Sequence, residues 1–257
     1  MTETGDKGRM EFTYSGYKNL LSKLKEHEYS FIGYDEAIHI NNGKHVILRH
    51  DIDTDPRKAL KLAELENENG VGSTYFVLIT NDLYNAFSRE NRDIFRKIIQ
   101  LGHTIGLHYD EEAYPGEIGN EKAVCKNIIA ESKMLADAVN QPVSIFSYHR
   151  PSKQILDAQI KINGMINSYG ELFFHDFKYL SDSRRRWREP IDDIIDKEQY
   201  RNLHILTHAF WYGTENIDIH DTILNYIKMA DKDRYEIMSE NISDLFSIVA
   251  LNNDHFE

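Results

Sequence analysis

The segment HVILRHDID, residues 45–53, decides how this chain is expected to fold. Its residues 46–48 are apolar without interruption, which is typical of a buried strand. Charged residues follow at once, and charges beside a buried strand are costly unless they are paired or bind a metal. The segment therefore predicts a strand of a sheet whose end carries a chemical site.

Strand-like and helix-like segments alternate along the rest of the chain. The strand-like segments are 45–49, 73–79, 104–108, 143–148 and 203–206, with weaker ones at 165–169 and 177–180. The helical segments are 56–69, one around 94–99, 121–139, 223–229 and 242–251. Strands separated by helices need right-handed crossovers and form a parallel sheet. We predict an α/β fold, a distorted (β/α) barrel of about seven parallel strands, with a doubly wound open sheet as the alternative.

Composition limits the organisation and the partners of the chain. No repeat or linker interrupts it, so we predict a single domain over 1–257, with an N-terminal helical extension at about 1–44. The net charge of −12 argues against nucleic acid or an anionic membrane as a partner. Its one cysteine, Cys125, allows no internal disulfide.

The start of the chain and its hydropathy set the expected location. The first ten residues are polar and lack the apolar run of a secretory signal, and no apolar run is long enough to span a bilayer. We therefore expect a cytoplasmic protein without stable membrane insertion. Nothing in the sequence predicts the oligomeric state.

Asp51 and Asp53 are the first candidates for chemistry. Side chains two residues apart lie on the same side of an extended strand. Two neighbouring carboxylates repel each other, which favours a cation between them or a raised pKa on one. Asp55, before Pro56, is instead typical of a helix N-cap. We expect Asp51 and Asp53 to bind metal or to transfer protons.

Three histidines and an arginine follow other predicted strands. His108 precedes the acidic residues 110–112, and an imidazole beside carboxylates suits zinc or a similar ion. A packed histidine before a solvated acidic turn is the alternative. His149 and Arg150 close the next strand, where the arginine could hold a carboxylate through two hydrogen bonds or lie in a surface turn. His208 could be a general acid or a packed residue among aromatic neighbours.

Taken together, these segments resemble the polysaccharide deacetylase (NodB homology) family, in order over about 46–211. Asp51 resembles the family's base and Asp53 its metal-binding aspartate. Arg150 resembles the arginine that orients the base, and His208 resembles the histidine that protonates the leaving amine. The resemblance implies a (β/α) barrel and a metal-dependent hydrolase.

The resemblance also implies the metal site. Asp53 and His108 would bind a divalent metal, with zinc as the first choice. The family usually has a second metal histidine four positions after the first, and here Glu112 stands in that position. The third ligand is open between Glu112 and His149, or water could fill its place.

The expected reaction is removal of an N-acyl group, acetyl or formyl, from an amino sugar that is free, nucleotide-linked or lipid-linked. The segment 179–183, together with 186–188, resembles a divergent branch of the family associated with surface-glycan biosynthesis. It would be a substrate-binding loop, with sugar contacts from Asp182, Arg186 and Trp187, and from Trp211 beyond it. The alternative is a solvated basic loop around a packed tryptophan.

Two other functions remain open. A non-catalytic glycan- or metabolite-binding protein could keep the barrel and lose the metal, and Glu112 in place of histidine favours this alternative. A metal phosphoesterase draws only on the aspartates after the first strand.

Overall fold

The computed structural model describes residues 10–40 and 42–249. The chain forms two compact units, Met1–Thr214 and Glu215–Glu257. One domain over 1–257 stays a prediction. No helix in the described ranges is long and apolar enough to cross a membrane.

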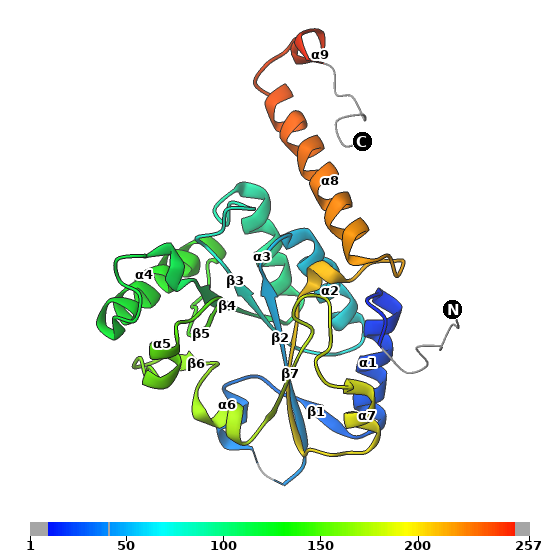
Figure 1. Ribbon diagram of the computed structural model, residues 1–257, viewed down its shortest axis with the longest axis vertical. Coiled ribbons are helices and arrows are strands. Elements are labelled where there is room, and N and C mark those ends of the chain that lie inside the picture. The colour runs from blue at the N-terminus through cyan, green and yellow to red at the C-terminus, as the bar shows by residue number, and fades with distance from the viewer. Residues whose placement is uncertain (1–9, 41, 250–257) are drawn as a thin grey trace, which may run out of the picture. The chain divides into compact units, whose positions relative to one another are not determined.

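A parallel sheet lies at the centre of the first unit (Figure 1). Its strands are β1 Tyr29–Phe31, β2 Lys44–Ile52, β3 Thr74–Val77, β4 Thr104–Tyr109, β5 Ile145–Tyr148, β6 Ile166–Asn167, β7 Lys178–Ser181 and β8 Asn202–Thr207. The order is β6-β5-β4-β3-β2-β8-β7, with β1 beside the start of β2. The pairings are parallel. Among the described residues no pairing joins β6 to β7, so the barrel is open and distorted, as predicted.

Except for the first helix, which precedes β1, the α-helices of the first unit connect successive strands (Figure 1). They are α1 Tyr14–Glu26, α2 Pro56–Glu68, α3 Arg89–Gln100, α4 Glu121–Val139, α5 Lys153–Ala158, α6 Glu171–His175 and α7 Ile191–Asp196, with 3-10 turns at η1 Glu36–His39, η2 Glu111–Ala113 and η3 Ala209–Trp211. The second unit holds α8 Ile219–Ser239 and α9 Leu245–Ile248.

The structure corrects two predicted boundaries. The extension at 1–44 contains α1 and η1 but also β1, which pairs with β2 in the register Tyr29↔Lys44 and is therefore part of the sheet. Residues 1–9 and 41 of that extension lie outside the described residues. The last helix is shorter than the predicted 242–251, because α9 covers only Leu245–Ile248; positions 250 and 251 also lie outside the described residues.

Helix α2 begins where its cap predicts. The Asp55 side chain accepts a hydrogen bond from the Arg57 N–H, and Pro56 occupies the first turn, where its missing N–H costs nothing. The helix buries Ala59 and Leu62 against the sheet. Its start directly after β2 keeps the residues between strand and helix at one edge of the sheet.

A buried carboxylate, Glu66, joins α2 to the sheet and to α1. It accepts hydrogen bonds from the hydroxyls of Tyr17 at 2.5 Å, Tyr75 at 2.7 Å and Ser73 at 2.7 Å, and its Oε1 lies 2.8 Å from His50 Nε2. Burial alone would raise the pKa of Glu66, but His50, the charge of His103 and the hydrogen bond from Tyr17 lower that pKa to about 2. His50 therefore belongs to a buried hydrogen-bond network and lies on β2, the strand that also carries Asp51.

Candidate active site

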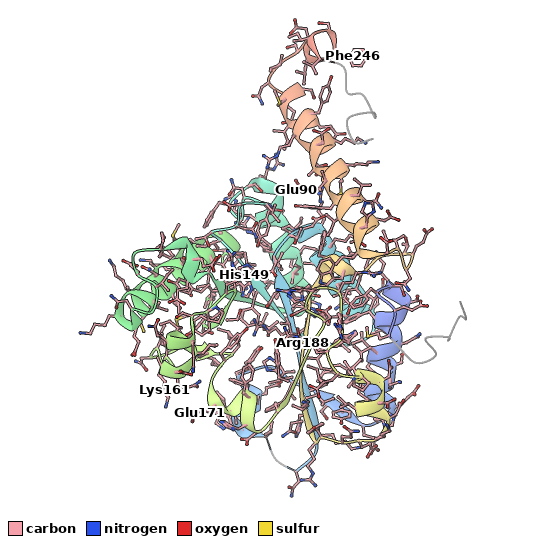
Figure 2. All side chains as sticks on the ribbon, viewed as in Figure 1. Glu90, His149, Lys161, Glu171, Arg188 and Phe246 are labelled. Atoms are coloured by element: carbon pink, nitrogen blue, oxygen red, sulfur yellow. The ribbon has the colours of Figure 1, made fainter. Side chains whose placement is uncertain are left out.

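Four strands bring the candidate residues to one edge of the sheet. Asp51 and Asp53 come from the end of β2, His108 from β4, His149 from just after β5 and His208 from just after β8. Because carboxyl ends of parallel strands meet at the same edge, residues far apart in the sequence become neighbours there. Figure 2 labels His149 among them.

Asp53, His108 and His149 form a group that could hold a metal ion. Asp53 Oδ1 lies 3.3 Å from His108 Nε2 and 3.4 Å from His149 Nδ1, and the two ring nitrogens are 3.3 Å apart. Asp53 Oδ1 is buried without a hydrogen-bond partner, which fits an atom placed to receive an ion. One carboxylate and two imidazoles are a donor set typical of zinc and similar divalent ions.

The charge of Asp53 suits this role. Burial would raise the pKa of Asp53, but His108 and His149 hold it well below its usual range. The carboxylate is therefore ionised at neutral pH, as a metal ligand must be.

Of the two alternatives for a third ligand, the structure brings His149 into the group and leaves Glu112 outside it. The side chain of Glu112 is 55% exposed and its Oε2 lies 2.9 Å from Arg150 Nη1. Residue 112 follows the strand end into the turn η2, whereas residue 149 comes directly after β5, beside the end of β4.

A serine fixes the orientation of His108. Its Nδ1 lies 2.7 Å from Ser147 Oγ, and the two residues are partners in the register of β4 and β5. Ser147 is fully buried. A partner on the second ring nitrogen sets which nitrogen faces a metal, so this contact leaves Nε2 of His108 toward Asp53.

Asp51 is held by Arg49, to which the sequence pattern assigned no role. Arg49 Nε and Nη2 donate to the two carboxylate oxygens of Asp51, both at 2.8 Å. The guanidinium is fully buried and lies 4.9 Å from the centre of the Phe76 ring and 5.0 Å from that of Tyr169. The signal in the sequence was the two-residue spacing, which places both side chains on the same side of β2.

This ion pair also decides the charge of Asp51. Burial would raise the pKa of Asp51, but the guanidinium of Arg49 and the neighbouring His108 lower it. Asp51 Oδ2 lies 3.4 Å from His108 Nε2, so the ionised carboxylate is beside the metal-binding group.

Arg150, expected to orient Asp51, lies elsewhere. Its Nη2 donates to Asp110 Oδ2 at 2.7 Å and its Nη1 contacts Glu112. The side chain is more than half exposed, and its described contacts are to this acidic turn. Arg150 therefore joins two loops at the rim, because the acidic turn after β4 faces the turn after β5.

His208 is paired with Asp182. Its Nδ1 lies 2.6 Å from Asp182 Oδ1, its backbone N–H donates to both carboxylate oxygens at 3.1 Å, and Tyr212 Oη donates to Oδ2 at 3.2 Å. Burial would lower the pKa of His208, but the Asp182 charge raises it to about 9. The imidazole is thus protonated at neutral pH, with Nε2 3.6 Å from Asp53 Oδ2.

A pocket of about 450 Å³ opens over these residues. It is lined by Asp51, Asp53, His108, His149 and His208, by the aromatic side chains Tyr148, Tyr169, Phe174, Tyr179 and Trp211, and by Ser181, Ser183, Arg184, Arg188 and Leu206. Figure 2 labels two residues that line it, His149 and Arg188, from segments distant in sequence.

The four residues expected to contact the sugar are placed differently from one another. Trp211 lines the pocket. Asp182 is fully buried behind His208, and Trp187 packs into the hydrophobic core with 6% of its surface exposed. Arg186 is exposed and is absent from the pocket lining. The basic loop reaches the pocket instead through Arg184 and Arg188, which were not among the expected sugar contacts.

Known proteins match this chain only in fold. No protein-family model matches it, and no curated protein does. The Streptococcus pyogenes deacetylase PplD in complex with acetate shares 16% identity over 55% of this chain and 65% of that chain, with a TM-score of 0.42. A CE4 family pseudoenzyme from Bacillus anthracis shares 15% over 75% and 62%, with a TM-score of 0.44. A Streptococcus mutans CE4 esterase shares 17% over 79% and 87%, with a TM-score of 0.49.

The chain spans less than two thirds of the length of the first two structures. At identities of 15–17% the likeness concerns the fold alone. The chemistry proposed below therefore rests on the site itself.

Proposed function

We propose that this chain is a divalent-metal hydrolase that removes an N-acyl group, acetyl or formyl, from an amino sugar. One observation carries the proposal: the donor group of Asp53, His108 and His149 lies in one pocket with an ionised carboxylate, Asp51, and a protonated imidazole, His208. A metal site flanked by a base and an acid is what amide hydrolysis requires.

Each residue has a defined task in this reaction. Asp53, His108 and His149 would hold the ion, with zinc as the first choice; the bound ion would polarise the acyl carbonyl and a water molecule. Asp51 would take the proton of the attacking water. Arg49 would fix the direction of Asp51 through its two hydrogen bonds.

The departing nitrogen needs a proton, and His208 supplies it. With a pKa raised to about 9, its imidazole carries that proton at neutral pH. Asp182 holds the ring through Nδ1, which leaves Nε2 directed at the site. The aromatic lining of the pocket supports a sugar as the group that carries the amide, because sugar rings pack against aromatic faces.

Replacement of Asp51 and of Asp53 separates base from ligand. Asp51→Asn should lower acyl release by about 10²–10⁴-fold, the usual contribution of a general base, while the protein still binds metal. Asp53→Asn should lose the metal and the activity together. Metal content by mass spectrometry and release of acetate or formate from N-acyl sugars measure both.

The same experiment tests a binding protein without catalysis. Purified protein that binds no metal, and that releases no acid after addition of zinc, cobalt or nickel, would refute the hydrolase. Equal loss of metal in Asp51→Asn and Asp53→Asn would refute the separate roles.

A further inference from the structure

We infer that the substrate carries an anionic group, a phosphate or a carboxylate, which Arg184 and Arg188 bind in the active-site pocket. The inference rests on the proposed function and adds a substrate class to it. Both arginines line the same pocket as Asp53 and His149, so one bound molecule can meet the metal-binding group and the guanidinium groups together.

Neither guanidinium has a partner among the described residues. Arg49 is paired with Asp51 and Arg150 with Asp110, whereas the structure shows no ion pair or hydrogen bond for Arg184 or Arg188 within 10–40 and 42–249. The guanidinium geometry matches phosphate and carboxylate groups, which it can bind through two parallel hydrogen bonds. Two such groups in one pocket form a receptor for an oxyanion.

Nearby acids do not take this role. Glu189, the nearest acid in sequence to Arg188, has its carboxylate 2.7 Å from Lys178 Nζ. Asp182 is fully buried and occupied by His208. The side chains that could neutralise the two arginines within the loop are thus already in use.

The loop holds Arg184 in a conformation that side chains rarely adopt. Arg184 and Arg185 have φ angles of 59° and 55°, in the left-handed region that disfavours residues other than glycine. Two anchors enclose them: Asp182 is bound to His208, and Trp187 packs into the core. Strained backbone held between anchors is common at ligand sites, and here it accompanies a side chain that lines the pocket.

The charges of the pocket are divided between two sets of residues. The carboxylates that line it, Asp51 and Asp53, belong to the metal-binding and catalytic group, and the arginines belong to the loop after β7. The whole chain carries a net charge of −12, which repels an anion at long range. An anionic substrate therefore needs local cations, and Arg184 and Arg188 provide them.

Binding of matched sugars tests the inference. The probes are N-acetylglucosamine, N-acetylglucosamine 1-phosphate and N-acetylmuramic acid, titrated calorimetrically into the metal-loaded full chain at fixed ionic strength. We expect at least one anionic sugar to bind about tenfold or more tightly than the neutral one, with a preference that weakens as salt rises. The anionic sugar with the lower dissociation constant shows whether the site prefers a phosphate or a carboxylate.

Variants assign the preference to the loop. The double variant Arg184→Gln with Arg188→Gln should lose the preference, measured as the ratio of the dissociation constants of the neutral and the anionic sugar. Arg186→Gln is the matched control, because Arg186 is an exposed arginine of the same loop outside the pocket lining. It should keep the preference.

Equal or weaker binding of both anionic sugars by the unaltered protein would overturn the inference, whether or not the variants fold. Equal loss in Arg186→Gln would overturn it too. Hydrolysis of neutral and anionic sugars without preference would leave the proposed function intact and refute the inference. Tighter binding of the anionic sugars without hydrolysis of any sugar would support the inference and refute the proposed function.

Discussion

Arg49 and Asp51 lie two positions apart on β2, and their ion pair is the closest contact of the proposed base. An arginine that holds a carboxylate through two bonds fixes its direction as well as its charge. Lysine offers a point charge without that planar geometry, so the two residues are not interchangeable here.

Arg49→Lys should therefore lower kcat more than tenfold, since the base keeps its charge and loses its alignment. The matched control is Arg150→Lys, which alters the arginine that contacts Asp110 and Glu112. Its kcat should change less than about twofold. Acyl release measures both, with circular dichroism to verify folding. A larger loss in the Arg150 variant would return the orienting role to that residue.

The pairing of His208 with Asp182 predicts a pH effect. A general acid works while it is protonated, so activity falls as pH rises through its pKa, which is raised to about 9. Asp182→Asn removes the charge that raises this pKa, and the basic limb of the kcat/KM profile should move to lower pH. Tyr212→Phe, which removes only a hydrogen bond to Asp182, should move it far less. An unmoved limb in Asp182→Asn would exclude His208 as the acid.

At the scale of single residues, the sequence indicated that residues after different strands lie together, but it did not specify how their side chains pair. Strand ends in a parallel sheet meet, so the positions of Asp51, Asp53, His108 and His208 at predicted strand ends were enough to group them. The two-residue spacing was the signal for the pair of Arg49 and Asp51, whereas the direction of Arg150 depends on the turn after β5, which no sequence spacing specifies.

Among the elements, α2 depends on the buried Glu66. Its carboxylate receives three hydroxyl donors and the ring of His50, from β2, β3 and α1 and from the residue before β3. Buried acceptors are stabilising only while their donors remain matched. The position of α2 relative to β2, and with it the turn that carries Asp53, depends on this network.

Glu66→Gln should lower the free energy of unfolding by about 2–4 kcal/mol, because an amide presents donors to groups that also donate. Glu68→Gln, on the exposed face of the same helix, should change it by less than about 0.5 kcal/mol. Urea unfolding measures both. If both variants lowered the free energy of unfolding equally, the hydrogen-bond network of Glu66 would not stabilise the fold.

The same carboxylate predicts acid sensitivity. The pKa of Glu66 is about 2 in the folded protein against 4.5 ordinarily, so its contribution is present above the unfolded value and is lost as pH falls from about 4.5 toward 2. The stability difference between the parent protein and Glu66→Gln should shrink over that window. A constant difference would contradict the lowered pKa.

The elements differ in how far the sequence predicted them. Helix α2 was predicted because Asp55 and Pro56 mark its start, and 121–139 because its apolar period is long. Strand β1 was missed since three residues are too few for a period, and only pairing with β2 makes them a strand.

At the scale of the molecule, a bound ion would link three strands of the first unit that are separate in the sequence. Asp53, His108 and His149 come from the ends of β2, β4 and β5, and the unfolded chain offers no such cluster. A ligand that binds only the folded state stabilises it by mass action. The order of the motifs predicted this convergence, because each segment follows a different strand.

Zinc at about 100 times its dissociation constant should therefore add roughly 2.7 kcal/mol and raise the melting temperature of the protein. A chelator should reverse the rise, and Asp53→Asn should show none. Glu112→Gln is the matched control, since this exposed carboxylate lies outside the group, and it should respond like the parent protein. Loss of the response in Glu112→Gln would make that residue the third ligand.

The place of β2 in the sheet has a consequence for the stability of the candidate site. This strand carries Arg49 and Asp51, and it is hydrogen-bonded along its length to β1, β3 and β8. Its amide hydrogens can exchange with solvent only when those neighbours separate, so they should be among the slowest in the first unit. The pairing of Arg49 with Asp51 is then insensitive to the motion of peripheral loops and should be lost only when the strands beside β2 separate.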